Sequence, residues 1–303
     1  MSSRSKPTII ERLRDSWVHW THAAYLTMVL GTSFFLTAPE KAEWSHKVAL
    51  IAIASYFVVL LLFLFWFIHT YSRKARYAEA MRLVHSSVHD IRDIAGYLER
   101  CVRKTDTFSP RVLKDALQGC LNAAALAFSM VTGARCRICI KVVGGTNATT
   151  AYVTTACRDK LSEQDNECKA RDEKEDHSHL ISKNSDFNFL VHGGNSYYLN
   201  GDIPGTHGYM NTSKSHYKDK LPYRSTIVLP VRRTFAVSSN QTNYRSPEVV
   251  GFLCIDSHSR FSFTEKYDVQ MGAILADAIC PILEWWIRLE RKTQKATAVR
   301  SSN

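Results

Sequence analysis

An uncharged apolar run from Val48 to Ile68 is the feature that most constrains the fold of this chain. A helix of about 21 residues rises about 1.5 Å per residue and so spans about 30 Å, the thickness of a bilayer's hydrocarbon core. A core helix of a soluble protein is usually shorter and carries a polar stripe, whereas Ser55 and Tyr56 are the only polar residues here. The run therefore predicts a transmembrane helix.

A second uncharged run, from Trp17 to Ala38, precedes it. A signal peptide is the alternative, but the apolar part is too long and Pro39 follows the one small-residue cleavage point. We interpret the run as a first transmembrane helix. His19 and His22 lie three residues apart on one face of it, either as an intramembrane proton or metal site or as residues of the headgroup zone.

The connector between the two runs, residues 39–47, is so short that the spans form an antiparallel hairpin. Lys and Arg favour the cytoplasmic side of a membrane. Four such residues stand in 1–16 and four more follow the second span (Arg73, Lys74, Arg76 and Arg82), against two in the connector. The sequence thus predicts a two-span protein of the inner (plasma) membrane with both termini in the cytoplasm. This topology also accounts for the net charge of +11, so we expect a lipid bilayer as partner and no nucleic acid.

A regular apolar stripe follows the second span. The spacing of its members alternates between four and three residues, which is the heptad period of a left-handed coiled coil. The sequence therefore predicts a parallel homodimer, although a helix docked on its own chain gives a similar stripe. The predicted dimer seam consists of Tyr77, Met81, Val84, Val88, Ile91, Ala95, Leu98 and Val102.

The same helix contains His89 followed by Asp90. This pair resembles the phospho-acceptor box of sensor histidine kinases, over four residues. No Asp-x-Gly-x-Gly segment and no Walker-type Gly-Lys-Ser/Thr sequence follows, so the ATP-binding half of a kinase has no counterpart in this sequence. His89 is either an acceptor for a partner kinase or a solvent-facing histidine.

The rest of the chain predicts an α+β domain. Ser109 and Pro110 are typical of a helix start, and Gly133 of its end. The predicted strands cover residues 136–143, 150–156, 225–231 and 248–256, with a short helix at 184–191 and a final helix at 265–291.

Three segments near the end resemble a GAF domain: Tyr223–Val231, Val249–Ser257 and Phe261–Leu283. The matching positions are Gly251, Leu253, Asp256, Phe263, Thr264 and Asp268. The resemblance covers residues ~110–290 and implies an antiparallel sheet with the first and last helices on one face. It also implies a module for small-molecule binding or dimer signalling. Some members bind cyclic nucleotides, haem or bilins.

Alternation along the strands predicts which side chains form a pocket. Ile138, Ile140, Val142, Leu253 and Ile255 should face the helices, and the alternate residues should face a concave pocket. Aromatic rings could stack on a ligand and a guanidinium could meet an anion. The candidate ligand-binding residues are Arg137, Cys139, Tyr197, Tyr198, Asp202, Thr226 and Cys254.

The eight cysteines are scattered, as is typical of reduced thiols in the cytosol. Cys136 and Cys139 form a C-x-x-C sequence, but on a strand they face opposite sides and cannot chelate one metal ion. Cys157, Cys168, His177 and His179 match no common metal-ligand spacing. We therefore predict no metal site, and in the absence of a catalytic motif we predict no enzyme. The sequence does not identify a cofactor.

The sequence predicts five segments: residues 1–16 as a cytoplasmic N-terminal segment, 17–71 as two transmembrane helices (17–38 and 48–70), 72–104 as a signalling and dimerisation helix, 105–291 as a GAF-like sensor domain, and 292–303 as a flexible tail. The predicted function is that of a membrane-anchored sensory or regulatory protein. Its cytoplasmic domain would bind an unidentified small molecule or signalling partner. One alternative is a ligand-triggered, membrane-perturbing effector of bacterial antiphage defence. The other is a degenerate histidine-kinase component.

Overall fold

The computed structural model describes Tyr25, Val29 and residues 43–103, 106–145, 150–164, 179–212, 221–233 and 249–301. The chain divides into two compact units, Met1–Ala75 and Arg76–Asn303. Apart from Tyr25 and Val29, the predicted first span at 17–38 lies outside the described residues, as do His19 and His22.

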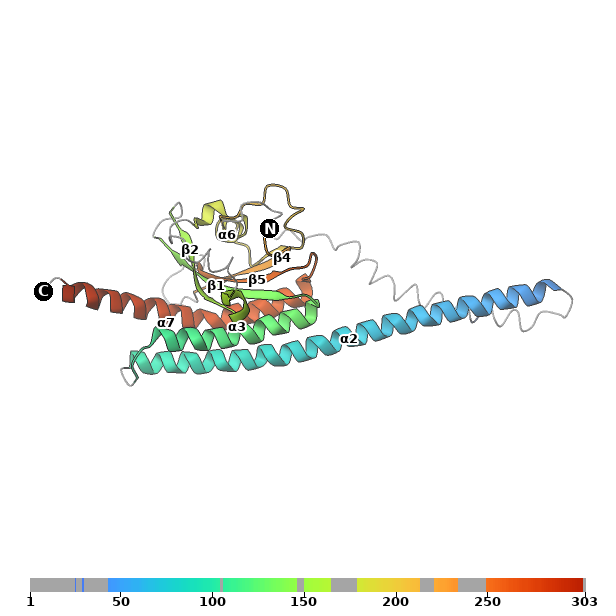
Figure 1. Ribbon diagram of the computed structural model, residues 1–303, viewed down its shortest axis with the longest axis horizontal. Helices are drawn as coiled ribbons and strands as arrows, with labels where there is room; N and C mark the ends of the chain where they lie inside the picture. Colours follow the sequence, from blue (N-terminus) through green and yellow to red (C-terminus); the bar gives the residue numbers. More distant parts are fainter. Residues whose placement is uncertain are drawn as a thin grey trace, which may run out of the picture. The chain divides into compact units, whose positions relative to one another are not determined.

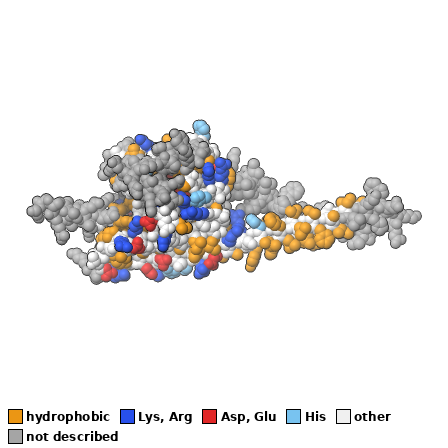
Figure 2. All heavy atoms as spheres, viewed as in Figure 1, with side chains coloured by type: hydrophobic (Ala, Val, Ile, Leu, Met, Phe, Trp, Pro, Cys, Tyr) orange, Lys and Arg blue, Asp and Glu red, His pale blue; other side chains and the backbone are white. Residues whose placement is uncertain are grey.

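The first unit contains the apolar part of helix α2, which runs from Glu43 to Val102 over 60 residues. Most large apolar side chains between Ile51 and Tyr71 are exposed, with Phe65 at 72%. Figure 2 shows hydrophobic side chains gathered along the visible face of this segment. Within the described residues, α2 is the one helix long and apolar enough to cross a membrane, with a mean hydropathy of 2.7 in its most apolar window.

The second unit is built on a five-stranded antiparallel sheet in the order β2-β1-β5-β4-β3. The central strand β5 pairs with β1 and β4, so that Ile255 lies opposite Ile138 on one side and Ile227 on the other. Four of these strands overlap the predicted ones, while β3 was not predicted. The strands are β1 (Cys136–Gly144), β2 (Tyr152–Arg158), β3 (Tyr198–Asn200), β4 (Ser225–Arg232) and β5 (Val249–Ser257).

Helices α3 (Pro110–Thr132) and α7 (Gln270–Ser301) cover one face of this sheet (Figure 1). Ser109 caps α3 as predicted: its hydroxyl oxygen accepts a hydrogen bond from the Val112 amide at 3.4 Å, and Gly133 ends the helix in the left-handed region with φ 68°. The α7 helix extends ten residues beyond the predicted end at 291, to Ser301, because residues 292–301 contain no Gly or Pro.

The part of α2 that belongs to the second unit packs against the same layer of helices. Its buried side chains join the core beneath the sheet, and they are Ala80, Val84, Ile91, Ile94 and Leu98. The buried positions again recur every three or four residues, so the heptad stripe serves in part to dock the helix on its own chain.

Side-chain hydrogen bonds link α2 to the start of the last helical segment. This segment begins with a π-helical turn, η4 (Glu265–Val269), that leads into α7. The buried carboxylate of Asp268 accepts hydrogen bonds from the Thr264 amide at 2.6 Å and the Thr264 hydroxyl at 2.9 Å. Its other oxygen accepts one from the Tyr77 hydroxyl at 3.0 Å. One carboxylate therefore caps a helix and holds α2 in place.

The opposite face of the sheet carries shorter elements, the 3-10 turn η2 (Ile181–Lys183) and α6 (Ser185–His192). The short helix α4 (Lys160–Gln164) packs against α3 instead, where Lys114 and Glu163 form an ion pair at 2.7 Å. The predicted division of the two faces is confirmed. Ile138, Ile140, Leu253 and Ile255 belong to the core under the helices, and Val142 packs against it. Cys139, Phe252 and Cys254 belong to a separate cluster on the other face.

Candidate ligand-binding site

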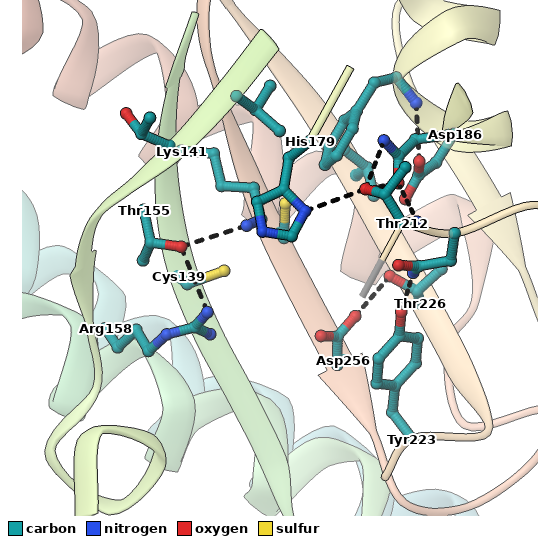
Figure 3. Close-up of a pocket in the computed structure, with 17 residues that line it drawn as sticks. Cys139, Lys141, Thr155, Arg158, His179, Asp186, Thr212, Tyr223, Thr226 and Asp256 are labelled. Atoms are coloured by element: carbon teal, nitrogen blue, oxygen red, sulfur yellow. Dashed lines mark hydrogen bonds between the residues drawn. The ribbon is translucent and has the colours of Figure 1, made fainter. Parts of the chain in front are cut away.

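A small cavity opens on the face of the sheet that α3 and α7 leave uncovered (Figure 3). It has a volume of about 60 Å³ and is partly open to solvent. Because side chains alternate along a strand, β1 contributes Cys139 and Lys141 to it, and β5 contributes Cys254 and Asp256. The pocket is therefore lined by the residues that lie between the core residues of the same strands.

One wall of the pocket is cationic. The Lys141 ammonium on β1 donates a hydrogen bond to the Thr155 hydroxyl at 3.2 Å, and the Arg158 guanidinium at the end of β2 donates to the same oxygen at 3.2 Å. In Figure 3 all three side chains lie beside Cys139. Two positive charges that lie side by side on one wall are well placed to bind an anionic group.

The wall across the pocket is acidic. Asp256 on β5 accepts a hydrogen bond from the Thr226 hydroxyl at 2.7 Å. Asp186 in the first turn of α6 is 6% exposed and accepts from the Phe187 amide at 2.8 Å and the Tyr209 hydroxyl at 3.5 Å. Burial, together with the negative charge of Asp256, raises the pKa of Asp186 to about 6. A cationic group in the pocket would stabilise both carboxylates.

Amide and hydroxyl groups hold the rim of the pocket in place. The Asn184 side chain accepts a hydrogen bond from the Thr212 amide at 3.0 Å and donates to the Leu180 carbonyl at 2.7 Å. The Nδ1 atom of His179 lies 3.0 Å from the Thr212 hydroxyl. Two segments far apart in the sequence thus meet through one threonine, and this rim is built by loops rather than by the sheet.

Two thiols lie among the lining residues of the sheet. Cys139 on β1 and Cys254 on β5 are directly opposite each other in the register, and both are buried free cysteines. A hydrogen bond from the Cys254 thiol lowers the pKa of Cys139 to about 7, with help from Arg158 and Lys141 and against the effect of burial. The same hydrogen bond and burial raise the pKa of Cys254 well above its ordinary value.

Three of the predicted ligand-binding residues line this pocket: Cys139, Thr226 and Cys254. The other four are not among its lining residues. Arg137 is buried on β1, opposite Asp256 in the register. Tyr197 donates a hydrogen bond to the Glu265 carboxylate, Asn200 donates one to the Tyr198 hydroxyl at 3.1 Å, and Asp202 pairs with Arg260 at 3.1 Å.

The charged residues of the pocket were not predicted from the sequence. Lys141 and Asp256 could have been found, because they stand two residues from Cys139 and Cys254 and so share their face of the sheet. Asp186 and Thr212 gave no such signal, since they come from a short helix and a loop whose placement depends on tertiary contacts. Within the described residues, no group of three or more His, Cys, Asp or Glu side chains could hold a metal ion.

The predicted dimer seam divides into two rows in the structure. Val84, Ile91 and Leu98 are buried in the core of their own chain, and Tyr77, Val88, Ala95 and Val102 are half-buried and pack against it. Only the first row is fully buried, because Met81 is exposed and Val88, Ala95 and Val102 keep part of their surface accessible. His89 is exposed, with its Nε2 atom 2.9 Å from Nε2 of His85. Its phosphorylation stays a prediction.

No family model matches this chain, and no curated protein matches it. Solved structures with a similar fold include GAF domains. The GAF domain of a phosphoenolpyruvate-protein phosphotransferase from Acinetobacter is 12% identical, covers 65% of this chain and 91% of its own, and has a TM-score of 0.37. The phycoerythrobilin-bound GAF domain of a cyanobacterial phytochrome is 13% identical, with coverage of 63% and 94% and a TM-score of 0.31.

An enzyme also stands among the similar structures. The type II free methionine-R-sulfoxide reductase of Thermoplasma acidophilum is 15% identical, covers 56% of this chain and 94% of its own, and has a TM-score of 0.34. At such identities and scores, neither a ligand nor an activity can be carried over to this chain. The antiparallel five-stranded sheet with its helices fits the GAF-like fold that the sequence motifs predict.

Proposed function

We propose that the second unit is a sensory domain that binds a small zwitterionic metabolite of the amino-acid class. The observation that supports this proposal is the opposition of charges across one pocket. Lys141 and Arg158 lie on one wall, with Asp186 and Asp256 on the other. A ligand that carries both a carboxylate and an ammonium group would satisfy both walls at once.

The buried carboxylate of Asp186 explains why such a ligand would bind with specificity. Its raised pKa means that ionisation costs free energy in the empty pocket. An ammonium group beside it would offset that cost, whereas a neutral or anionic ligand would not. The small cavity holds the charged groups of the ligand, and the partly open side of the pocket leaves room for its side chain.

The test is a binding titration of the full-length chain in detergent micelles against a panel of amino acids. Each amino acid is matched with its decarboxylated amine and its N-acetyl derivative, and binding is measured by calorimetry. We expect the zwitterion to bind at least about tenfold more tightly than either partner, since one charged hydrogen bond contributes about 1.5–3 kcal/mol. Equal binding of the amine, or no binding of any amino acid at millimolar concentration, would contradict the proposal.

Variants of the two walls separate recognition from folding. Lys141→Met should weaken binding of the zwitterion without affecting binding of the decarboxylated amine. Asp186→Asn should weaken binding of the zwitterion without affecting binding of the N-acetyl derivative. Arg111→Ala is the matched control, because Arg111 is an exposed cation on α3, which covers the other face of the sheet. A loss of binding in that control would indicate a general electrostatic effect.

The membrane anchor is a further part of the proposed function. The exposed apolar segment of α2 supports one span, and the run from Trp17 to Ala38 supports a second, with both termini in the cytoplasm of the inner membrane. The prediction is tested with reporter fusions at residues 42 and 303. A periplasmic signal is expected from the first fusion and a cytoplasmic one from the second. Any other combination contradicts the two-span topology.

We further propose that the sensory domain forms a homodimer and couples to the membrane segment through α2. The row Met81, Val88, Ala95 and Val102 is not fully buried in its own chain and is suited to pack on a second copy. Met81→Cys or Val88→Cys should give crosslinked dimers in membranes, while Ser86→Cys on another face of the helix should not. Inserting two residues near Arg76 should then change the ligand response, because it rotates one part of the helix against the other.

A further inference from the structure

Four buried cysteines that the structure describes fall into two chemical groups. Burial raises the pKa of Cys120 and Cys157 to about 12 and that of Cys136 to about 11, so these thiols stay protonated. Cys139 is equally buried but has a pKa of about 7. A substantial fraction of it is therefore thiolate at physiological pH, which is the nucleophilic form of cysteine.

The surroundings of Cys139 account for this difference. The thiol of Cys254 lies directly opposite on the neighbouring strand, and its interaction with Cys139 is the largest effect that lowers the pKa of Cys139. Arg158 and Lys141 add positive charge from β2 and β1, and the charge of Asp256 on β5 acts in the opposite direction. Cys254 keeps its proton, so the pair holds one thiolate and one thiol side by side in the same pocket.

The position of the pair in the sheet permits a bond between the two sulfurs. Residues directly opposite each other in an antiparallel ladder have Cα atoms about 4.5–5.5 Å apart. Disulfides span Cα distances of about 4.4–6.8 Å. A disulfide between Cys139 and Cys254 therefore requires no large movement of the backbone. By contrast, Cys136 lies opposite Ser257, so this nearby cysteine has no thiol across the ladder.

We propose that Cys139 and Cys254 form a redox-active dithiol in the pocket, which a small hydroperoxide oxidises to a disulfide. The cavity of about 60 Å³ suits this substrate class, because about 10–15 Å³ of such space already holds one water molecule and hydrogen peroxide is only slightly larger. The guanidinium of Arg158, held on the Thr155 hydroxyl at 3.2 Å, lies on the cationic wall next to the attacking sulfur. It would stabilise the oxygen anion that leaves.

The chemistry proceeds in two steps. The Cys139 thiolate attacks one oxygen of the hydroperoxide and the O–O bond breaks. The leaving alkoxide or hydroxide takes a proton from solvent, and Cys139 becomes a sulfenic acid. The Cys254 sulfur then attacks the Cys139 sulfur, the S–O bond breaks, and the departing hydroxide takes the Cys254 proton to form water. Two thiols and one hydroperoxide thus give one disulfide, one alcohol or water, and one further water, and the peroxide accepts the two electrons.

The first experiment uses the reduced full-length chain in detergent, without any ligand. It is treated with a few equivalents of hydrogen peroxide, quenched, alkylated and mapped by mass spectrometry. We expect the peptides of Cys139 and Cys254 to be joined and the joined species to be lost on treatment with dithiothreitol. Cys139 should react on the order of a hundredfold faster than Cys157, because so little of the latter is thiolate. Oxidation of other cysteines at the same rate, or survival of both thiols, would overturn the proposal.

Variants then assign the two roles. Cys254→Ser should stop the reaction at a sulfenic acid on Cys139, which dimedone traps, and Cys139→Ser should leave Cys254 unreactive. Cys157→Ser is the control and should keep the disulfide. A disulfide from Cys139 to any other cysteine in the wild-type protein would contradict the assignment, and this measurement needs no variant to fold.

A pH titration of the alkylation rate distinguishes a thiolate from a thiol that is merely accessible to the reagent. Cys139 should react with a haloacetamide with a midpoint near pH 7. The other charged or titratable groups that line the pocket are Lys141, Arg158, His179, Asp186, Tyr223, Cys254 and Asp256. A midpoint near that of an ordinary thiol would refute a thiolate at Cys139. The oxidation requires no bound metabolite, so it can succeed where the binding titration fails, and the reverse also holds.

Discussion

The two faces of one sheet follow different physical rules. On the helix-covered face, Leu253 and Ile255 of β5 lie in a continuous apolar core. On the open face, the residues between and beside them, Cys254 and Asp256, line a pocket with charges and thiols. The same strand therefore carries stability on one side and chemistry on the other. Apolar burial drives folding on the first side, whereas the second keeps an ionisable group buried at a cost.

The largest expected effect is the loss of a core side chain on the helix-covered face. Leu253→Ala should lower the free energy of unfolding of the second unit by about 3 kcal/mol, within a usual range of about 2–5, because it opens a cavity between the sheet and the helices. Denaturant unfolding followed by the fluorescence of Trp285 and Trp286 on α7 measures it. The neighbouring Cys254→Ala removes less volume from the other face and should lower the free energy of unfolding by less. An equal loss would contradict the view that the helix-covered face contributes more to stability.

Replacing the buried carboxylate of the open face should raise the free energy of unfolding rather than lower it. The folded-state pKa of Asp186, about 6, lies above the reference value of 3.8, so the stability it contributes is fully present below about pH 4 and is lost as pH rises through 6. Asp186→Asn should therefore stabilise the protein at pH 7.5 by up to about 3 kcal/mol, at 1.36 kcal/mol per unit, and by little at pH 4. Unfolding at both pH values tests this. A variant that is less stable at pH 7.5 would show that the carboxylate contributes to folding.

Two glycines allow a comparison in which a single methyl group is added, one in the sheet and one in helix α3. A Cβ atom at Gly251 on β5 would lie 2.5 Å from the Lys141 carbonyl oxygen, so Gly251→Ala should disturb the pairing of β1 with β5 and cost about 1–3 kcal/mol. At Gly119 in α3 nothing lies within 4 Å of such an atom, and Gly119→Ala should stabilise the helix by about 0.5–1 kcal/mol. The same unfolding assay measures both, and a neutral Gly251→Ala would mean that the two strands can separate at no cost.

The smallest effect is expected on the surface. Arg111 and Asp115 form an ion pair on α3 at 3.9 Å, with side chains 91% and 68% exposed. Arg111→Ala should change the free energy of unfolding by less than about 0.5 kcal/mol, and salt should reduce even that. A larger change would reveal a contact of this helix that the isolated chain does not make.

Much of the fold could be predicted because it depends on local patterns. Alternation in Ile138, Cys139 and Ile140 assigned both faces of β1, and Ser109 and Gly133 marked both ends of α3. The short strand β3 was missed, since three residues carry too little pattern to stand out from a loop. The stripe on α2 was found, but its period alone cannot distinguish a second copy from the chain's own helices.

The pocket was only partly predictable for a physical reason. Its strand residues follow from alternation, and Cys139, Thr226 and Cys254 were found in that way. Tyr197 and Asp202 were chosen for their chemistry, yet their side chains are engaged by Glu265 and Arg260. Such pairings join residues more than fifty positions apart, and a single sequence gives no information on them.

The hydrogen bond between Tyr77 and Asp268 has a practical consequence for protein production. A soluble fragment that starts at residue 105, where the sensor domain was predicted to begin, would lack Tyr77 and the apolar side chains of Val84, Ile91 and Leu98. It would expose the core surface that they cover and would be prone to aggregate. A fragment that starts at Arg76, where the second unit begins, keeps both the hydrogen bond and this part of the helix. Its core under the sheet therefore stays covered.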